Sequence, residues 1–354
     1  MISQGLTVSG KKYFAASNSG SGFKSYFNEL FFNNDIKRRY IIKGGPGTGK
    51  STLMRRVGER AEREGRDVEY YYCSSDSSSL DGVVVDSSTA IFDGTSPHSY
   101  DTVLPGAVDE IVDLGRFWNS DALSRVSEQI RNISSVKKSC YGRAYRYLAA
   151  SREVYLALED LVLPYVDRAK LVSAVRRVSE RIESGMGARI TPLAVSAVGV
   201  HGRVRFDSLE RASSELYGIC DSYGTAKIYL EALVAELLRK GCRLRVAYDP
   251  IDTDAIEAVL VENSGECFYV SREEQLPPEI QKINMRRFLF CERLAEIRGE
   301  YRSGEKQIEA LITLAEGELS GAGEAHARLE KIYSDNMDFD ALNAFFGNFI
   351  EKII

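Results

Sequence analysis

The sequence lacks several patterns that would place it in a specialised class of protein. Its six cysteines contain no Cys-x-x-Cys pair and no zinc-ligand spacing, so we expect reduced thiols. No run approaches the roughly 18 apolar residues of a membrane helix, and the first residues lack the basic and apolar regions of an export signal. We therefore expect a cytoplasmic location and no membrane partner.

A strong net charge is also absent. The formal charge of −5 over 354 residues argues against a generally basic surface, and so against nucleic acid as a partner. With 44% hydrophobic and 27% charged residues, the composition is that of an ordinary globular protein. A chain of this length exceeds what one hydrophobic core usually covers, so two domains are expected.

The sequence does contain one complete phosphate-binding loop. Residues 44–52 read Gly-Gly-Pro-Gly-Thr-Gly-Lys-Ser-Thr, which fits the P-loop pattern Gly-x-x-x-x-Gly-Lys-Ser. The apolar segment 40–42 before the loop predicts a buried strand, and apolar residues at helical spacing after it predict a helix. Because the motif requires a strand, a glycine loop and a helix in this order, nucleotide binding is predicted.

The residue types of this loop suit a triphosphate. Glycine allows positive φ angles and a close approach of backbone N–H groups to an anion, and the N-terminus of a helix attracts negative charge. Lys50 is expected to reach the β- and γ-phosphates, and the Ser51 hydroxyl to bind Mg²⁺. The residues predicted to contact ATP are Gly45, Pro46, Gly47, Thr48, Gly49, Lys50, Ser51 and Thr52.

The chain repeats itself at a nearly constant offset. Several residues of the loop and its helix recur 177 residues later, namely Gly47, Thr48, Lys50, Leu53 and Val57. A second block recurs at an offset of 176 and a third at 181, in the same order along the chain. We interpret this as an ancestral duplication in which each half is an α/β core followed by a helical region. The alternative is shared periodicity without common origin.

The predicted fold is α/β of the P-loop NTPase type, with a mainly parallel sheet and the ligand at its carboxyl edge. In the first half we predict strands near 12–16, 39–43, 68–73 and 89–92, a helix from 50 to about 64, and helices over 107–118, 120–133 and 143–166. The predicted domains are a P-loop core at 1–105, a helical region at 106–186, a degenerate P-loop-like core at 187–272 and a C-terminal helical region at 273–354, with a bend at 276–278.

The second loop, residues 221–229, has lost the chemistry of the first. Asp221 replaces Gly44, which adds a negative charge, and Ile228 replaces Ser51, which removes the hydroxyl for Mg²⁺. Lys227 keeps its charge, and Asp221 is a candidate to neutralise it. We therefore predict that this half binds no Mg²⁺-nucleotide and serves as a packing or regulatory partner.

Two carboxylates are candidates for the chemistry at the first loop. Asp93 ends an apolar strand, as a Walker B aspartate that binds Mg²⁺ does, and the position aligned with it in the second half is Tyr269. Asp76 lies in a serine-rich loop after a neighbouring strand and is a candidate base or phosphate sensor. Asp252 occupies the equivalent place in the second half, which favours a turn or cap role instead.

Other candidates depend on how the chain folds. The stretch 17–23 is either a lid that places Phe23 on the nucleotide or a surface loop. His98 either contacts a phosphate or is structural, whereas His201 and His326 have no ligand-like neighbours in sequence. The arginines at 143, 146 and 152 either form a positive lid or are solvated.

These motifs resemble a known family. The runs 42–54, 73–76, 80–83, 93–98 and 105–111 are similar to those of poorly characterised bacterial ATP-binding proteins, mainly of spore-forming Firmicutes, and the similarity extends over most of the chain. This resemblance implies a duplicated P-loop architecture, a nucleoside triphosphate hydrolase fold and ATP binding, with no assigned substrate. The family's second half often has its own glycine-rich loop, and the erosion at 221–229 departs from that pattern. The loop 44–52 also resembles that of AAA-type ATPases, without their arginine-finger or sensor regions.

Three functions are compatible with these observations. The leading hypothesis is an ATPase that hydrolyses ATP with Mg²⁺ at the first loop and couples hydrolysis to a conformational change between the halves. The second is a kinase for a small molecule, with Asp76 as its base. The third is a module that senses nucleotide without chemistry. The sequence leaves open whether the halves pack within one chain or in a homo-oligomer.

Overall fold

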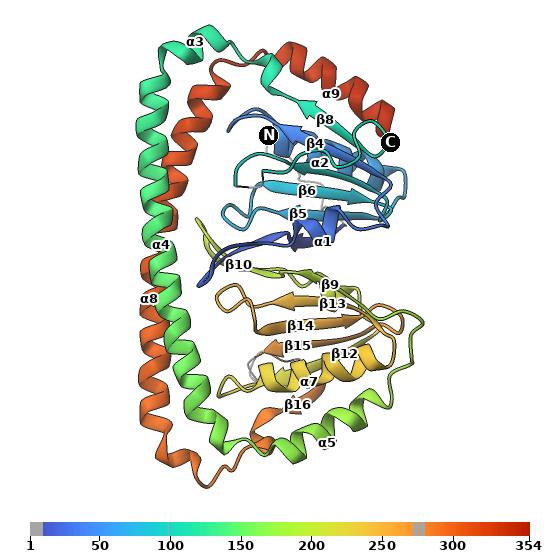
Figure 1. Cartoon of the computed structure of the whole chain (residues 1–354), viewed down its shortest axis with the longest axis vertical. Helices are drawn as coiled ribbons and strands as arrows, with labels where there is room; N and C mark the ends of the chain where they lie inside the picture. The colour runs from blue at the N-terminus through green and yellow to red at the C-terminus, as the bar shows by residue number, and fades with distance from the viewer. Residues whose placement is uncertain (1–9, 98, 272–275, 277–279) are drawn as a thin grey trace, which may run out of the picture.

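The computed structural model describes residues 10–97, 99–271, 276 and 280–354. Two mixed sheets lie on one side of a pair of long helices, α4 (Ser127–Val162) and α8 (Arg298–Ser334), as Figure 1 shows. The fold is therefore α/β, as predicted.

The first sheet has six strands in the order β1-β5-β6-β7-β4-β8. Their bounds are Lys11–Phe14 (β1), Arg38–Lys43 (β4), Val68–Tyr72 (β5), Leu80–Val85 (β6), Thr89–Asp93 (β7) and Asp109–Asp113 (β8). Strand β6 runs antiparallel to both of its neighbours, and the other neighbouring pairs are parallel. The carboxyl ends of β4, β5 and β7 therefore lie at one edge of the sheet.

The sheet is mainly parallel, as predicted, but it is mixed because β6 runs the other way. The connections 73–79 and 86–88 are too short to hold a crossover helix and so turn β6 back as a hairpin strand. The helix predicted over 107–118 is wrong. Those residues form β8 and a 3-10 turn, Gly115–Phe117, because 109–113 pair with the free edge of β4.

The second sheet repeats the order and the directions of the first, as β16-β12-β15-β14-β13-β9. Its strands are Arg189–Leu193 (β9), Glu215–Cys220 (β12), Arg243–Tyr248 (β13), Ile256–Val261 (β14), Glu266–Ser271 (β15) and Gln281–Asn284 (β16). Pro277 and Pro278 of the predicted bend lie outside the described residues.

The two sheets meet where their outer strands β1 and β9 end. Phe14 and Ala194 form an antiparallel bridge there, with reciprocal backbone hydrogen bonds of 2.8 and 3.1 Å. A buried ion pair crosses the same junction, from Arg245 Nη1 on β13 to Glu69 Oε1 on β5 at 2.7 Å. One hydrophobic core includes residues from both sides of this junction, so the halves are packed against each other.

A hairpin from each half reaches the other half. The first is β2 (Ala16–Ser19) with β3 (Gly22–Ser25), and the N–H of Gly20 at its tip donates to Ile251 O at 2.9 Å. The second is β10 (Ser196–Gly199) with β11 (Gly202–Arg205), and the N–H of Val200 donates to Ser75 O at 2.8 Å. The stretch 17–23 therefore extends to the loop 249–252 of the second half.

The helices also exchange between the halves. Helix α2 (Lys50–Arg63) packs on the first sheet and α7 (Ala226–Arg239) on the second. Helix α4 leads away from the first sheet to α5 (Arg168–Ser179), which packs on α7, and α8 returns to α9 (Phe339–Ile353), which packs on α2 (Figure 1). Three short helices complete the description, α1 (Phe27–Phe31), α3 (Ser120–Arg125) and α6 (Ser208–Arg211).

The long helices run antiparallel and stand beside the carboxyl ends of the central strands. Gly304 near the start of α8 lies against Leu158 near the end of α4, and Lys137 of α4 contacts His326 near the end of α8. The predicted helices 120–133 and 143–166 thus correspond mostly to one continuous helix. Among the described helices, none combines the length and the apolar character that crossing a bilayer requires.

Candidate functional site

The loop between β4 and α2 has the backbone conformation of an anion cradle. Gly47 and Gly49 have φ angles of +66° and +83°, which glycine adopts readily. Gly49 directly precedes α2, so the backbone N–H groups around it lie at a helix N-terminus. Thr48 is buried and its hydroxyl donates to Gly45 O at 2.8 Å, which fixes the turn. The loop is therefore held in one defined backbone conformation, with its N–H groups at the start of a helix.

Lys50 and Asp93 converge at this loop. The Lys50 ammonium donates to Gly44 O at 3.1 Å and Gly45 O at 2.8 Å, and its Nζ lies 3.5 Å from Asp93 Oδ2. Asp93 ends β7, next to β4, and its Oδ1 accepts hydrogen bonds from the N–H and hydroxyl of Thr95 at 2.8 and 2.6 Å. Burial raises the pKa of Asp93, although Lys50 and Thr95 oppose the shift. The Asp93 carboxylate is costly to ionise because it is buried, and Lys50 compensates only part of this cost. A further cation next to Asp93 would stabilise its charged form.

The residues present fit a magnesium ion as partial ligands. Ser51 is the second residue of α2 and its hydroxyl oxygen accepts the N–H of Leu80 at 3.0 Å, so the side chain points toward β6. Asp81 is buried on β6, and its charge contributes to raising the pKa of Asp93, which places the two carboxylates close together. Among the described residues, no group of three or more His, Cys, Asp or Glu side chains could hold a metal. Phosphate oxygens and water would have to complete such a site, as is usual for Mg²⁺.

Helix α8 covers the loop with a carboxylate. The N–H of Gly47 donates to the Glu330 side chain, and a Cβ on Gly47 would lie 2.6 Å from the Glu330 carbonyl oxygen. Burial raises the pKa of Glu330, and repulsion by Asp76 adds to this effect. A carboxylate therefore holds one of the N–H donors that the sequence assigns to phosphate.

Further groups from the long helices surround the cradle. Lys137 Nζ lies 2.9 Å from His326 Nδ1, and burial with the nearby lysines 137 and 50 lowers the pKa of His326 to about 4. Gly45 lies against Tyr333 and Trp118, whose ring centroids are 5.9 Å apart. Lys137, His326 and Tyr333 have no local signal in the sequence, because only the packing of α4 and α8 brings them to the loop.

Asp76 lies beside the site and contacts the second half. Its Oδ1 accepts hydrogen bonds from the N–H and hydroxyl of Ser78, at 2.9 and 2.7 Å, and lies 3.2 Å from His201 Nε2. Burial raises the pKa of Asp76, but the bonds from Ser78 and His201 outweigh it and lower the pKa. His201 belongs to the tip of hairpin β10–β11. His201 and His326 have no ligand-like neighbours in sequence, but the fold brings them to Asp76 and Lys137.

The predicted arginine lid does not assemble over the first loop. Arg143 forms a bidentate ion pair with Glu318, with both distances 2.7 Å. Arg152 contacts Asp252 and Asp254, both at 2.9 Å, which places it at the second loop. His98 lies outside the described residues.

The Asp221 carboxylate occupies the backbone N–H groups of the second loop. Asp221 Oδ2 accepts the N–H of Ala226 at 2.7 Å, and Oδ1 accepts the N–H of Tyr223 at 3.0 Å. Lys227 pairs with Glu159 at 3.1 Å and Asp252 at 3.3 Å rather than with Asp221. The carboxylate of Asp221 thus occupies the N–H groups at the start of α7 that phosphate would need.

The strand register corrects one alignment between the halves. Ile42 on β4 is opposite Asp93, and Ile219 on β12, 177 residues after Ile42, is opposite Val270. Val270, rather than Tyr269, therefore takes the place of Asp93. Neither side chain has a carboxylate, so the difference between the halves is unchanged.

Part of the chain is similar to a known family. The family described as Nephrocystin 3, N-terminal, matches residues 24–86. This segment runs from β3 to just past β6, and it contains the loop 44–49 and α2. The match covers less than half of the chain, so it describes this segment only. Searches of curated proteins and of solved structures gave no match.

Proposed function

We propose that the protein is a P-loop NTPase that binds ATP and hydrolyses it with Mg²⁺ at the first loop. The observation that carries this proposal is the glycine cradle at the start of α2, where Lys50 and Asp93 converge at 3.5 Å. The buried carboxylate and the lysine each gain a new partner when a metal and a triphosphate bind, since Lys50 then pairs with phosphate and Asp93 with the metal. Glycines in the left-handed region let the backbone N–H groups face an anion, and ATP would take the Gly47 N–H from Glu330.

Each residue has a proposed role. The backbone N–H groups of 45–50 bind the phosphates, and Lys50 holds the β- and γ-phosphates. Ser51 and Asp93 hold Mg²⁺, which neutralises charge that develops on the phosphates. Thr95 orients Asp93 through its two hydrogen bonds. Asp76 is held near the γ-phosphate end as a polar group that orients water.

We further propose that the nucleotide state is passed to the second half through Asp76. The contact of Asp76 with His201, and of Ser75 with Val200, supports this because both partners belong to the β10–β11 hairpin. A phosphate that repels or moves the Asp76 loop would move the hairpin with it. Switches of this kind depend on contacts that change with the γ-phosphate.

The second half is proposed to be a partner that binds no Mg²⁺-nucleotide. Asp221 already uses two N–H groups of its loop, and neither Ile228 nor Val270 offers an oxygen to a metal. The repeated strand order supports common ancestry of the halves, and the resemblance to duplicated bacterial ATP-binding proteins agrees with it. The kinase alternative keeps Asp76 as a base, but the ion pairs of Arg143 and Arg152 remove its proposed lid.

The proposal is tested by comparing two equivalent lysines. ATP with Mg²⁺ at 100 times its Kd should stabilise the wild type by about 2.7 kcal/mol, seen as a rise in melting temperature. Lys50→Ala should lose both this rise and the release of phosphate from ATP. Lys227→Ala should keep both the rise in melting temperature and the release of phosphate. Each variant is compared with its own nucleotide-free form. Equal loss in the two variants, or no rise in the wild type, would contradict the proposal, and binding without turnover would favour the sensing module.

A further inference from the structure

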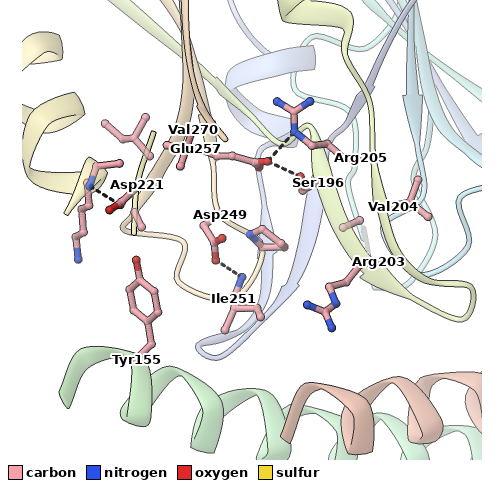
Figure 2. Close-up of a pocket in the computed structure, with 16 residues that line it drawn as sticks. Tyr155, Ser196, Arg203, Val204, Arg205, Asp221, Asp249, Ile251, Glu257 and Val270 are labelled. Atoms are coloured by element: carbon pink, nitrogen blue, oxygen red, sulfur yellow. Dashed lines mark hydrogen bonds and ion pairs between the residues drawn. The ribbon is translucent and has the colours of Figure 1, made fainter. Parts of the chain in front are cut away.

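The second half contains a cavity of about 360 Å³ where the first half has its nucleotide site (Figure 2). Asp221 of the second loop lies on one side, and Arg203 and Arg205 of hairpin β10–β11 on the other. Lys227 of the second loop also lines this cavity. A neighbouring cavity of about 200 Å³ shares the side chain of Tyr155. The first volume lies in the range of small-molecule sites.

The basic residues of the cavity are already neutralised. Lys227 faces Glu159 and Asp252, and Arg203 contacts Glu309 and Glu316 at 3.1 and 3.3 Å. Arg205 contacts Glu210 and, at 3.1 Å, Glu257. Each cation therefore has two carboxylate partners, so an anionic ligand would meet an excess of negative charge.

Two carboxylates in the wall have little compensating positive charge, because Glu257 shares Arg205 with Glu210 and Asp249 is held by backbone N–H groups. Glu257 accepts a hydrogen bond from Ser196 at 2.6 Å, but its Oε2 is buried and has no hydrogen-bond partner. Asp249 accepts the N–H groups of Ile251 and Asp252, at 2.8 and 2.9 Å, which carry no charge. Burial raises the pKa of both carboxyls, and that of Glu257 reaches about 7. A cation in the cavity would compensate both.

Aromatic rings line the smaller cavity. Tyr155 and Tyr301 lie on the two long helices, with hydroxyls 3.7 and 3.6 Å from the position of a Cβ on Gly224. Tyr223 packs against Tyr301 with ring centroids 4.9 Å apart. Glu159, Glu305 and Glu309 line the same cavity. Tyrosine faces beside carboxylates attract organic cations, because the ring quadrupole and the charges act in the same direction.

We propose that these two neighbouring cavities, both lined by Tyr155, together bind a small organic cation that carries ammonium groups, such as a linear diamine or polyamine. One ammonium group lies beside Glu257 and Asp249, and the alkyl chain extends past Tyr155 toward Tyr223 and Tyr301. The chain from Asp221 to Lys227, which has lost its use for phosphate, forms the wall between the two ends of the site.

The test is a calorimetric titration of putrescine and spermidine into the full-length Lys50→Ala variant without nucleotide, so that failure of ATP binding cannot affect the result. We expect saturable binding of at least one of them. Glu257→Gln, which keeps an acceptor for Ser196, should weaken binding about tenfold because it removes the charge. Tyr223→Ala should weaken it roughly two- to fivefold, and Tyr223→Phe, which keeps the ring, should not.

Matched controls make the outcome decisive. Glu128→Gln removes an exposed carboxylate at the far end of α4 and should leave the affinity unchanged. Absence of saturable binding at about 10 mM, well above a millimolar Kd, would overturn the proposal. Equal weakening by Glu128→Gln, or equal behaviour of the two Tyr223 variants, would also overturn it. The proposal would also be overturned if inorganic phosphate binds in place of the polyamines and Lys227→Ala abolishes the binding of phosphate.

Discussion

The carboxylate of Glu330 competes with the nucleotide for the first loop, so neutralising it should tighten ATP binding. It accepts the N–H of Gly47, which the proposed function assigns to phosphate. Glu330→Gln keeps an oxygen that can accept this N–H but removes the charge. ATP then has a weaker competitor to displace and meets less repulsion.

The magnitude follows from the kind of bond that is weakened. Hydrogen bonds to charged groups contribute about 1.5–3 kcal/mol and those between neutral groups about 0.5–1.5 kcal/mol, so the change relieves about 1–1.5 kcal/mol. The Glu330 side chain is 50% exposed, and screening by solvent reduces this figure. We therefore expect ATP to bind about three- to tenfold more tightly to Glu330→Gln.

The assay is a titration of ATP with Mg²⁺ by calorimetry, with Glu324→Gln, an exposed position on the same helix, as the control. An unchanged or weaker affinity of Glu330→Gln would refute the reasoning, as would an equal gain in the control.

The pH dependence of ATP affinity gives a second check. Because burial raises the pKa of Glu330, protonation begins above the ordinary carboxyl range. The advantage of the variant should be full at neutral pH and should shrink as pH falls through the raised pKa.

Three further predictions concern other contacts of the site. Asp93→Asn should retain ATP binding but reduce Mg²⁺-dependent phosphate release by at least about a hundredfold, measured by a phosphate assay, because the metal loses its charged ligand. Gly199→Ala should change ATP affinity without touching the first loop, since its Cβ would lie 2.5 Å from Ser75 O and displace the hairpin; an unchanged titration would show that the hairpin is not coupled. Phe346→Ala should destabilise the protein by about 3–5 kcal/mol in denaturant unfolding, because this α9 side chain is 1% exposed beside Gly49, and a loss under about 1 kcal/mol would show that α9 packs loosely.

The first loop was predictable because its chemistry is local. The strand, glycines, lysine and helix occupy consecutive positions, and the requirement for open N–H groups restricts the residues at each. Asp93 was also accessible, since an apolar strand that ends in a carboxylate is a local pattern. The structure places it 3.5 Å from Lys50, and its role toward Mg²⁺ stays a prediction.

Features that depend on packing were not accessible from the sequence. The residues of β8 have apolar spacing compatible with a helix, and only the free edge of β4 selects a strand. Glu330 reaches the first loop and His201 reaches Asp76 from far along the chain, and each looks like an ordinary surface residue in its own segment. For Asp221, the sequence predicts that its charge opposes phosphate but not which groups its carboxylate binds. Its negative charge was expected to oppose phosphate, but it satisfies backbone donors rather than Lys227.

The exchange of α5 and α9 between the sheets has a consequence for how the protein is made. Helix α9 includes the last helical residues, Phe339–Ile353, yet Leu342 and Phe346 close the environment of Gly49 in the first loop. A growing chain that does not yet include α9 lacks this cover over Gly49. We therefore expect the ATP binding proposed for the first loop to arise only once α9 has been synthesised.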